Sequence, residues 1–119
     1  MNWGIFMAAL IQIESGGDPS AIGDNGKAVG CLQIHPCVVE DVNRIYNQQF
    51  TLADRYNETK SKSMAVLYIV HYAGKLPEPV SAEVAARIWN GGPRGYEKRA
   101  TQSYWFDVRA AMNALELEL

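Results

Sequence analysis

The sequence predicts a mainly α-helical fold, on three observations. Apolar residues recur three or four positions apart along most of the chain, which is the period of an amphipathic helix. Only residues 28–34 have the short apolar character of a strand or extended segment. Hydrophobic residues make up 48% of the 119 residues and charged residues 20%, an ordinary globular composition. We therefore expect one compact domain over residues 1–119.

Charge and hydropathy argue against two kinds of partner. The chain carries 11 Lys and Arg against 13 Asp and Glu, a formal net charge of −2, which argues against nucleic acid as the main partner. No stretch approaches the roughly 18 apolar residues of a membrane span, so we expect no membrane insertion. Residues Ile5–Ile13 follow no Lys or Arg and precede no small-residue cleavage site, so no signal peptide is recognised and the export route stays open.

The first helix is predicted over residues 2–14, where the large apolar side chains share one face. The glycine pair at 16–17 can end it in the left-handed conformation, and the Asp-Pro pair at 18–19 disfavours its continuation. A tight turn is predicted at residues 23–26, because Gly, Asp and Asn tolerate a positive φ. The extended segment at 28–34 follows that turn.

Five further helices are predicted from capping residues, apolar periodicity and breaks at Gly, Asn or Pro. They are residues 37–46, a short capped segment that begins at 51–54, a long helix from Ser61 or Ser63 to 72–73, residues 81–89 with Ser81 as N-cap, and residues 96–115. Residues 115–119 are treated as a tail of the kind that cloning can leave, and no function is assigned to them.

Glu14 stands out chemically, because it is the last residue of an apolar helical face. The macrodipole is negative at a helix C-terminus and disfavours a carboxylate there, and apolar surroundings disfavour it further. Both effects raise the pKa of a carboxyl group, as a general acid working near neutral pH requires. For a glutamate considered alone, a solvated side chain at a frayed helix end is the ordinary alternative.

The residues around Glu14 form the first of four sequence blocks. The blocks read Ile-Glu-Ser-Gly-Gly-Asp-Pro-Ser-Ala-Ile at 13–22, Gly-Cys-Leu-Gln-Ile at 30–34, Trp-Asn-Gly-Gly at 89–92 and Thr-Gln-Ser-Tyr at 101–104. In this order they resemble the signature of the soluble lytic transglycosylases of the lysozyme-like superfamily. Each block alone is a weak signal, whereas the ordered set spans nearly the whole chain. The resemblance implies a lysozyme-like fold with a very small extended or β segment near residues 28–35.

The resemblance assigns roles to the residues of the first two blocks. Glu14 would be the catalytic acid/base, and Ser15 would orient it or form a hydrogen bond to the substrate. Gln33 would project into the cleft, and Gly30 would let a sugar approach the backbone closely.

The third and fourth blocks would supply the other wall of the cleft. Asn90 would contact the substrate or hold this wall, and Tyr104 would lie over the Glu14 side. Trp89 replaces the usual Tyr of the family and Gly91 its usual Ala, so the wall is expected to differ in shape. Trp89 could stack on a sugar face, although a tryptophan is more often part of the core.

The resemblance also implies a reaction and a location. The substrate would be the peptidoglycan glycan strand, cleaved at the β-1,4 bond between MurNAc and GlcNAc at the cell wall. A single acid/base suffices, because the 6-hydroxyl of the muramoyl sugar attacks the anomeric carbon and forms a 1,6-anhydro product. No metal or other cofactor is needed for this reaction, and a monomer is expected.

A lysozyme-type muramidase is the alternative within the same fold. Glycosidases usually have two carboxylates, and the candidate for the second is Asp24, ten residues after Glu14. However, Asp-Asn-Gly is also what a tight turn uses. On the motif match we favour the mechanism with one carboxylate.

Two hypotheses come from other functional classes. A non-catalytic cell-wall-binding module could share the fold, but a decayed enzyme would most readily have lost Glu14. A helical interaction or DNA-contacting protein would use the basic residues Arg87, Arg94, Lys98, Arg99 and Arg109. Acidic residues at 97 and 107 interrupt this set, which is typical of a solvated helix face.

The two cysteines, Cys31 and Cys37, leave the redox compartment undecided. They could close a small disulfide loop, and with His35 they form the pattern Cys-x3-His-x-Cys. A structural zinc site needs four ligands, and no fourth Cys or His lies nearby in the sequence. Thiols beside a core strand are therefore the favoured interpretation, and no metal is expected.

Overall fold

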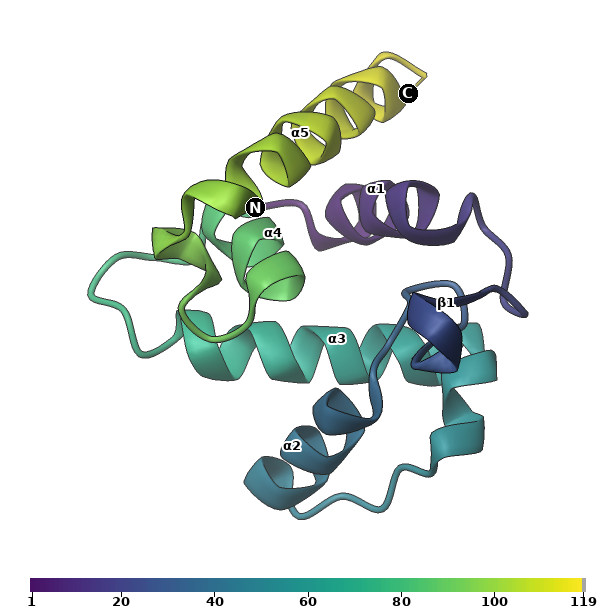
Figure 1. Cartoon of the computed structure of the whole chain (residues 1–119). Helices are drawn as coiled ribbons and strands as arrows, with labels where there is room; N and C mark the ends of the chain where they lie inside the picture. Colours follow the sequence, from purple (N-terminus) through teal and green to yellow (C-terminus); the bar gives the residue numbers. More distant parts are fainter. Residues whose placement is uncertain (119) are drawn as a thin grey trace. The chain divides into compact units, whose positions relative to one another are not determined.

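A computed structural model describes residues 1–118 of the chain (Figure 1). These residues form five α-helices, two short strands and four 3₁₀ turns, so the predicted mainly helical class is confirmed. Leu119, the last residue of the predicted tail, lies outside the described residues. No helix within residues 1–118 is long and apolar enough to cross a membrane.

The chain divides into two compact units. Unit 1 comprises residues 1–13 together with the chain from Ile69 onward, and unit 2 comprises Glu14–Tyr68. The expectation of one domain over residues 1–119 stays a prediction.

Helix α1 covers Trp3–Ser15, one residue further along the chain than predicted. The Asn2 side chain accepts a hydrogen bond from the backbone N–H of Ile5 at 3.1 Å and so caps the helix start. At the other end Gly16 and Gly17 have φ values of 65° and 93°. The helix therefore ends in the left-handed conformation, as predicted.

Unit 2 contains a two-stranded antiparallel sheet, with Ile22 opposite Val29. Strand β1 is Ile22–Gly23, strand β2 is Ala28–Val29, and the 3₁₀ turn η1, Asp24–Gly26, joins them. Asp24, Asn25 and Gly26 all have positive φ, which these residue types tolerate. A further bridge pairs Val29 with Ile34. The predicted extended segment at 28–34 therefore begins as a two-residue strand and then turns back, so that its last residue pairs with that strand.

Helix α2, Pro36–Tyr46, begins with proline at its first position and ends at Asn47, whose φ is 52°. The predicted short capped segment is confirmed as the 3₁₀ helix η2, Leu52–Tyr56. Thr51 and Asp54 form a capping box, in which each side chain accepts a hydrogen bond from the other residue's backbone N–H.

Helix α3 covers Glu58–Ala73, so its predicted start at Ser61 or Ser63 was wrong. The side-chain oxygen of Asn57 accepts a hydrogen bond from the backbone N–H of Lys60 at 2.9 Å. Asn57 therefore caps the helix, which starts at Glu58, three residues before Ser61.

Helix α4 covers Ala82–Gly91, and Ser81 caps it as predicted by accepting a hydrogen bond from the N–H of Val84. It continues two residues beyond the predicted end at Trp89. Helix α5 covers Gln102–Leu117. Its predicted start at Tyr96 was wrong, because two 3₁₀ turns, η3 (Gly95–Glu97) and η4 (Arg99–Thr101), precede it.

Unit 1 and unit 2 each have their own buried side chains. In unit 1, α4 packs against α5 and both 3₁₀ turns, and the buried residues include Phe6, Leu10, Ile69, Ala85, Ile88 and Val108. In unit 2 they include Val29, Cys31, Leu32, Ile34, Val42 and Met64. Two polar residues, Arg55 and Ser61, are also buried in unit 2.

Candidate active site

The predicted site residues lie in both units. Unit 2 contains those of the first two blocks and the alternative second carboxylate: Glu14, Ser15, Asp24, Gly30 and Gln33. Unit 1 contains those of the third and fourth blocks: Trp89, Asn90 and Tyr104.

Ser15 ties the end of α1 to the second sequence block. Its hydroxyl donates a hydrogen bond to the backbone carbonyl of Cys31 at 2.8 Å. The same oxygen accepts a hydrogen bond from the backbone N–H of Gly17 at 3.1 Å. Because a hydroxyl has one proton to donate, this arrangement uses it to hold the helix end. Glu14, which precedes Ser15, lies in the last turn of α1 and is half-buried.

Gln33 holds the loop between β2 and α2 through its side-chain amide. The amide nitrogen donates to the carbonyls of Ala21 and Gly30, at 3.1 and 3.0 Å. Both amide protons are thus used on the backbone, while the side-chain oxygen lies close to the Cα of Gly23, where an added Cβ would come within 2.5 Å of it. Gln33 itself has a φ of 53°, a sparsely populated conformation for a residue with a side chain.

The surroundings of residue 30 in the fold require a glycine. Its φ is 87°, and a Cβ there would lie 1.9 Å from the backbone carbonyl oxygen of Arg55. No side chain fits so short a distance, so Gly30 lets the 28–34 segment lie directly against η2. A sugar contact at Gly30, which is itself buried, stays a prediction.

Asp24 pairs with a histidine at the edge of the turn. Its carboxylate lies 2.8 Å from the Nε2 atom of His35, and the two side chains are 68% and 38% exposed, respectively. A pair so accessible to water contributes little to stability. His35 is also the residue just before α2, so the contact links η1 to the start of that helix.

Arg55 was missed by the sequence analysis, although it organises this part of unit 2. Only 8% of the residue is exposed. Its Nε donates to the carbonyl of Leu52 at 2.9 Å, and its Nη1 donates to those of Lys27 and Ile34, both at 3.0 Å. A single arginine between apolar and polar residues gives no sequence signal for this role.

In unit 1, Trp89 and Asn90 lie in the last turn of α4, and Tyr104 lies in the first turn of α5. Trp89 and Tyr104 are half-buried, whereas Asn90 is exposed. The ammonium group of Lys98 donates to the carbonyl of Gly91 at 2.6 Å. A cation at this position also interacts favourably with the negative end of the helix dipole.

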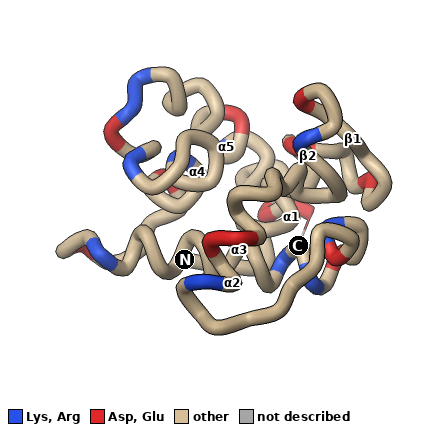
Figure 2. The backbone as a smooth tube through the Cα atoms, turned by 60° about the horizontal axis from the view of Figure 1, so that its bottom comes forward, with Lys and Arg blue, Asp and Glu red and all other residues tan. Residues whose placement is uncertain are grey.

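Four of the five basic residues that a DNA-contacting protein would use have partners within unit 1. Arg87 and Arg94 form ion pairs with Glu83 and Glu97, Lys98 bonds to Gly91, and the guanidinium of Arg109 lies 5.2 Å from the ring centre of Phe106. Figure 2 shows positive and negative segments alternating along α4 and the turns that follow. This is the mixed, solvated surface that the interrupted charge pattern predicted.

Cys31 and Cys37 are both free thiols, which answers the disulfide question that the sequence left open. Burial raises the pKa of the Cys31 thiol, and the carboxylate of Glu58 raises it further. Lys62 and a hydrogen bond with Ser61 act in the opposite direction but are weaker. Within residues 1–118, no three or more His, Cys, Asp or Glu side chains form a group that could hold a metal ion.

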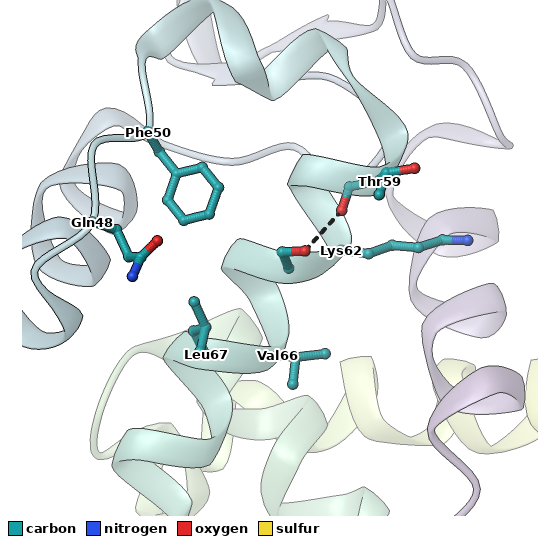
Figure 3. A pocket seen from close by; sticks show the side chains of 7 residues that line it. Gln48, Phe50, Thr59, Lys62, Val66 and Leu67 are labelled. Atoms are coloured by element: carbon teal, nitrogen blue, oxygen red, sulfur yellow. Dashed lines mark hydrogen bonds between the residues drawn. The ribbon is translucent and has the colours of Figure 1, made fainter.

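Unit 2 also has an open groove of about 760 Å³, which the sequence analysis did not foresee. It lies between the loop after α2 and the first half of α3, and Phe50, Val66 and Leu67 form its apolar part (Figure 3). Its lining residues are Gln48, Phe50, Thr59, Lys62, Ser63, Val66 and Leu67. None of the predicted site residues is among them.

Comparison with known proteins identifies a matching family and a similar fold. Residues 2–112 match the transglycosylase SLT domain. The chain is also similar to a chain in the crystal structure of Aeromonas hydrophila PliI in complex with Meretrix lusoria lysozyme, with a TM-score of 0.77 and 25% sequence identity. That similarity covers 89% of this chain and 87% of the other. No curated protein sequence matches the chain. The matched range includes every predicted site residue from Glu14 to Tyr104.

Proposed function

The chain belongs to the transglycosylase SLT domain family, and from that membership we propose that it is a peptidoglycan lytic transglycosylase with Glu14 as its only acid/base. The family is lysozyme-like and acts on peptidoglycan. The proposal adds two points to that membership. The bond cleaved is the β-1,4 linkage between MurNAc and GlcNAc, and the product is a 1,6-anhydromuramoyl sugar. The site of action would be the cell wall.

The hydrogen bond from Ser15 to Cys31 is the observation that carries this proposal. It joins the block that contains Glu14 to the block that contains Gly30 and Gln33, at 2.8 Å and across 16 residues of sequence. The two blocks that resemble the family are therefore one physical assembly in unit 2. Because Ser15 anchors the end of α1, the backbone of Glu14 beside it is held in place, which supports a role as a positioned proton donor.

In the proposed reaction Glu14 acts twice. As a carboxylic acid it gives its proton to the glycosidic oxygen, and the bond from that oxygen to C1 of MurNAc breaks. The resulting carboxylate then takes the proton of the C6 hydroxyl of the same MurNAc while that oxygen bonds to C1. Glu14 ends protonated, no water is consumed, and the product is a 1,6-anhydro sugar.

Gln33 could contact the substrate through its side-chain oxygen, because its amide nitrogen already bonds to the backbone. Both of its amide protons are used on the carbonyls of Ala21 and Gly30. Its side-chain oxygen is therefore the part that could accept a hydrogen bond from a sugar hydroxyl or N-acetyl N–H. Substrate contacts by Trp89, Asn90 and Tyr104 are part of the same proposal.

The contacts of Asp24 favour the mechanism with one carboxylate over hydrolysis. In a muramidase a second carboxylate would orient the attacking water or act as nucleophile. Asp24 instead lies on an exposed turn and pairs with His35, and its positive φ has the ordinary explanation of a turn residue.

The test is digestion of purified peptidoglycan by the unmodified chain and by Glu14→Gln, with the products identified by mass spectrometry. We expect anhydro-muropeptides from the unmodified chain. Glutamine keeps the size of the side chain but cannot transfer the proton, so the rate should fall by about 10²- to 10⁴-fold. Asp24→Asn is the matched control, and its rate should stay within about threefold, because the exposed contact between Asp24 and His35 has little structural effect.

Each contrary result identifies a different function. Reducing-end products, which are heavier by one water, together with loss of activity in Asp24→Asn, would identify a muramidase. No product from a chain that still sediments with the cell wall would identify a non-catalytic binding module.

A further inference from the structure

We infer that Arg55 is a positioning residue for the acid/base, acting through the 27–34 segment and the hydroxyl of Ser15. This inference rests on the transglycosylase activity proposed above. Its structural basis is a chain of hydrogen bonds inside unit 2, from the guanidinium of Arg55 to the end of α1.

Arg55 is a buried cation that bonds to backbone carbonyls only. Its guanidinium donates to the carbonyls of Leu52, Lys27 and Ile34, and no acidic side chain in the described part of the chain forms an ion pair with it. Keeping a charge out of water without an opposite charge is costly unless hydrogen bonds compensate for the lost hydration. The hydrogen bonds that compensate for the lost hydration of Arg55 therefore also hold these three carbonyls in place.

The two distant carbonyls belong to opposite ends of the segment that carries Gly30 and Gln33. Lys27 precedes β2, and Ile34 is the residue that bridges back to Val29. One nitrogen, Nη1, bonds to both ends at 3.0 Å. It therefore sets the distance between the ends of a segment whose own backbone hydrogen bonds join Val29 to Ile34 and Gly30 to Gln33.

The main chain of Arg55 contacts the same segment at Gly30. Its carbonyl oxygen lies against Gly30, where no side chain would fit, and it accepts a hydrogen bond from the buried hydroxyl of Ser61 at 2.9 Å. η2 is thereby fastened to α3 and to the 28–34 segment together. The rigid planar fork of arginine suits such multiple contacts, whereas the single ammonium of lysine does not.

The segment in turn holds the end of α1. The carbonyl of Cys31, in its centre, accepts the hydroxyl proton of Ser15. A shift of the segment would move this anchor and, with it, the neighbouring carboxyl group of Glu14. Misplacement of a reacting group by about 1 Å can lower a rate by about 100-fold, so the contacts of Arg55 should affect catalysis more than substrate binding.

The experiment compares Arg55→Lys and Arg55→Gln with Ser81→Ala as the control. Ser81→Ala removes the N-cap bond of α4, which lowers stability without changing any contact of Arg55. We measure kcat and KM on a soluble glycan-strand fragment, well below the melting temperature of every variant. Both Arg55 variants should lower kcat by about 10- to 100-fold, because a misplacement of about 1 Å can cost about 100-fold. KM should change less than about threefold, because the proposed substrate contacts of Trp89, Asn90 and Tyr104 lie outside the held segment. Ser81→Ala should change neither.

A second readout needs no enzymatic activity. Cys31 lies in the held segment and is 1% exposed, whereas Cys37 is exposed and serves as the internal reference. If Arg55 holds the segment, both Arg55 variants should label faster at Cys31 with a thiol reagent, and Ser81→Ala should not. Arg55→Gln, which buries no charge, keeps the test valid if Arg55→Lys does not fold.

The results separate the two proposals. Unchanged kcat and unchanged Cys31 labelling in a folded Arg55 variant would overturn the role of Arg55. Faster Cys31 labelling with unchanged kcat would show that Arg55 holds the segment but does not position Glu14, which also overturns the inference. If the unmodified chain releases no anhydro products, the proposed function fails, and the labelling alone decides whether Arg55 holds the segment.

Discussion

The thiol of Cys31 shows how one residue's surroundings set its chemistry. It lies in the second sequence block, is almost completely buried, and has a pKa raised mainly by that burial and next by Glu58. The thiol form is therefore favoured over the thiolate, which is the reactive species. The Cys31 side chain should therefore behave as a small apolar core residue. Its backbone carbonyl anchors Ser15 by accepting the hydrogen bond from the Ser15 hydroxyl.

We predict that the two cysteines react at very different rates. Near pH 8, a thiol reagent should modify Cys37 at least about 10-fold faster than Cys31, because only Cys37 is exposed. The measurement is the rate of labelling, with Cys37→Ser used to assign the slow phase. Two equally fast phases would show that Cys31 is accessible.

The raised pKa of Cys31 also predicts a dependence of stability on pH. A raised pKa in the folded state means that folding favours the protonated thiol. The stability linked to it is fully present below the unfolded-state pKa and is lost as the pH rises through the folded-state pKa. Above the ordinary thiol pKa of 9.0 the free energy of unfolding should therefore fall more steeply with pH for the unmodified chain than for Cys31→Ala. Equal slopes in urea unfolding would contradict this.

The junction between α4 and α5 shows how two elements explain a departure from the family pattern. The resemblance predicts Ala where this chain has Gly91, and a Cβ at Gly91 would lie 2.5 Å from the methyl carbon of Thr101. The hydroxyl of Thr101 accepts a hydrogen bond from Nε of Arg87 and lies 2.7 Å from the carbonyl oxygen of Gly95. Thr101 cannot easily move away, so the space next to α4 is filled.

We predict that Gly91→Ala is destabilising and that Thr101→Ser relieves the effect. Ala favours a helix over Gly by about 1 kcal/mol, but the overlap with the Thr101 methyl should cost about 1–3 kcal/mol. Serine keeps the hydroxyl and removes that methyl. Urea unfolding of both single variants and the double variant should give a favourable coupling of about 1–2 kcal/mol. Purely additive changes would show that the two side chains do not compete for this space.

The charge of the chain as a whole bears on the rival hypothesis of a DNA-contacting protein. Its formal net charge is −2, and four of the five basic residues that such a protein would use have partners inside unit 1. Binding to phosphates draws its free energy from neutralising them with free cations. A protein with this charge distribution has few to offer.

We therefore predict no binding of a short DNA duplex at low salt, where such attraction is strongest. Fluorescence anisotropy of a labelled duplex should stay at its starting value up to high protein concentration. Binding that weakens steeply as salt is added would contradict the prediction and favour the DNA-contacting hypothesis.

Features that depend on neighbours in the sequence could be predicted from it. The end of α1 at its two glycines, the capping box of η2, the Ser81 cap and the turn at Asp24 each involve residues within a few positions of one another. The helical class follows from the period of the apolar residues, and the family follows from four blocks in order. The candidate acid/base, Glu14, was found in this way.

Contacts between distant residues were decided only by the tertiary structure. Arg55 meets Lys27 across 28 residues, and Arg87 meets Thr101 across 14. No local pattern encodes either pair, so the role of Arg55 and the true start of α5 were not foreseen. The same holds for Gly30, whose need for glycine comes from the carbonyl of Arg55. Sequence determined the kind of protein and its candidate acid, because those signals are local. Only the fold decided which carbonyls the buried side chains hold, because these hydrogen bonds require the chain to be brought together first.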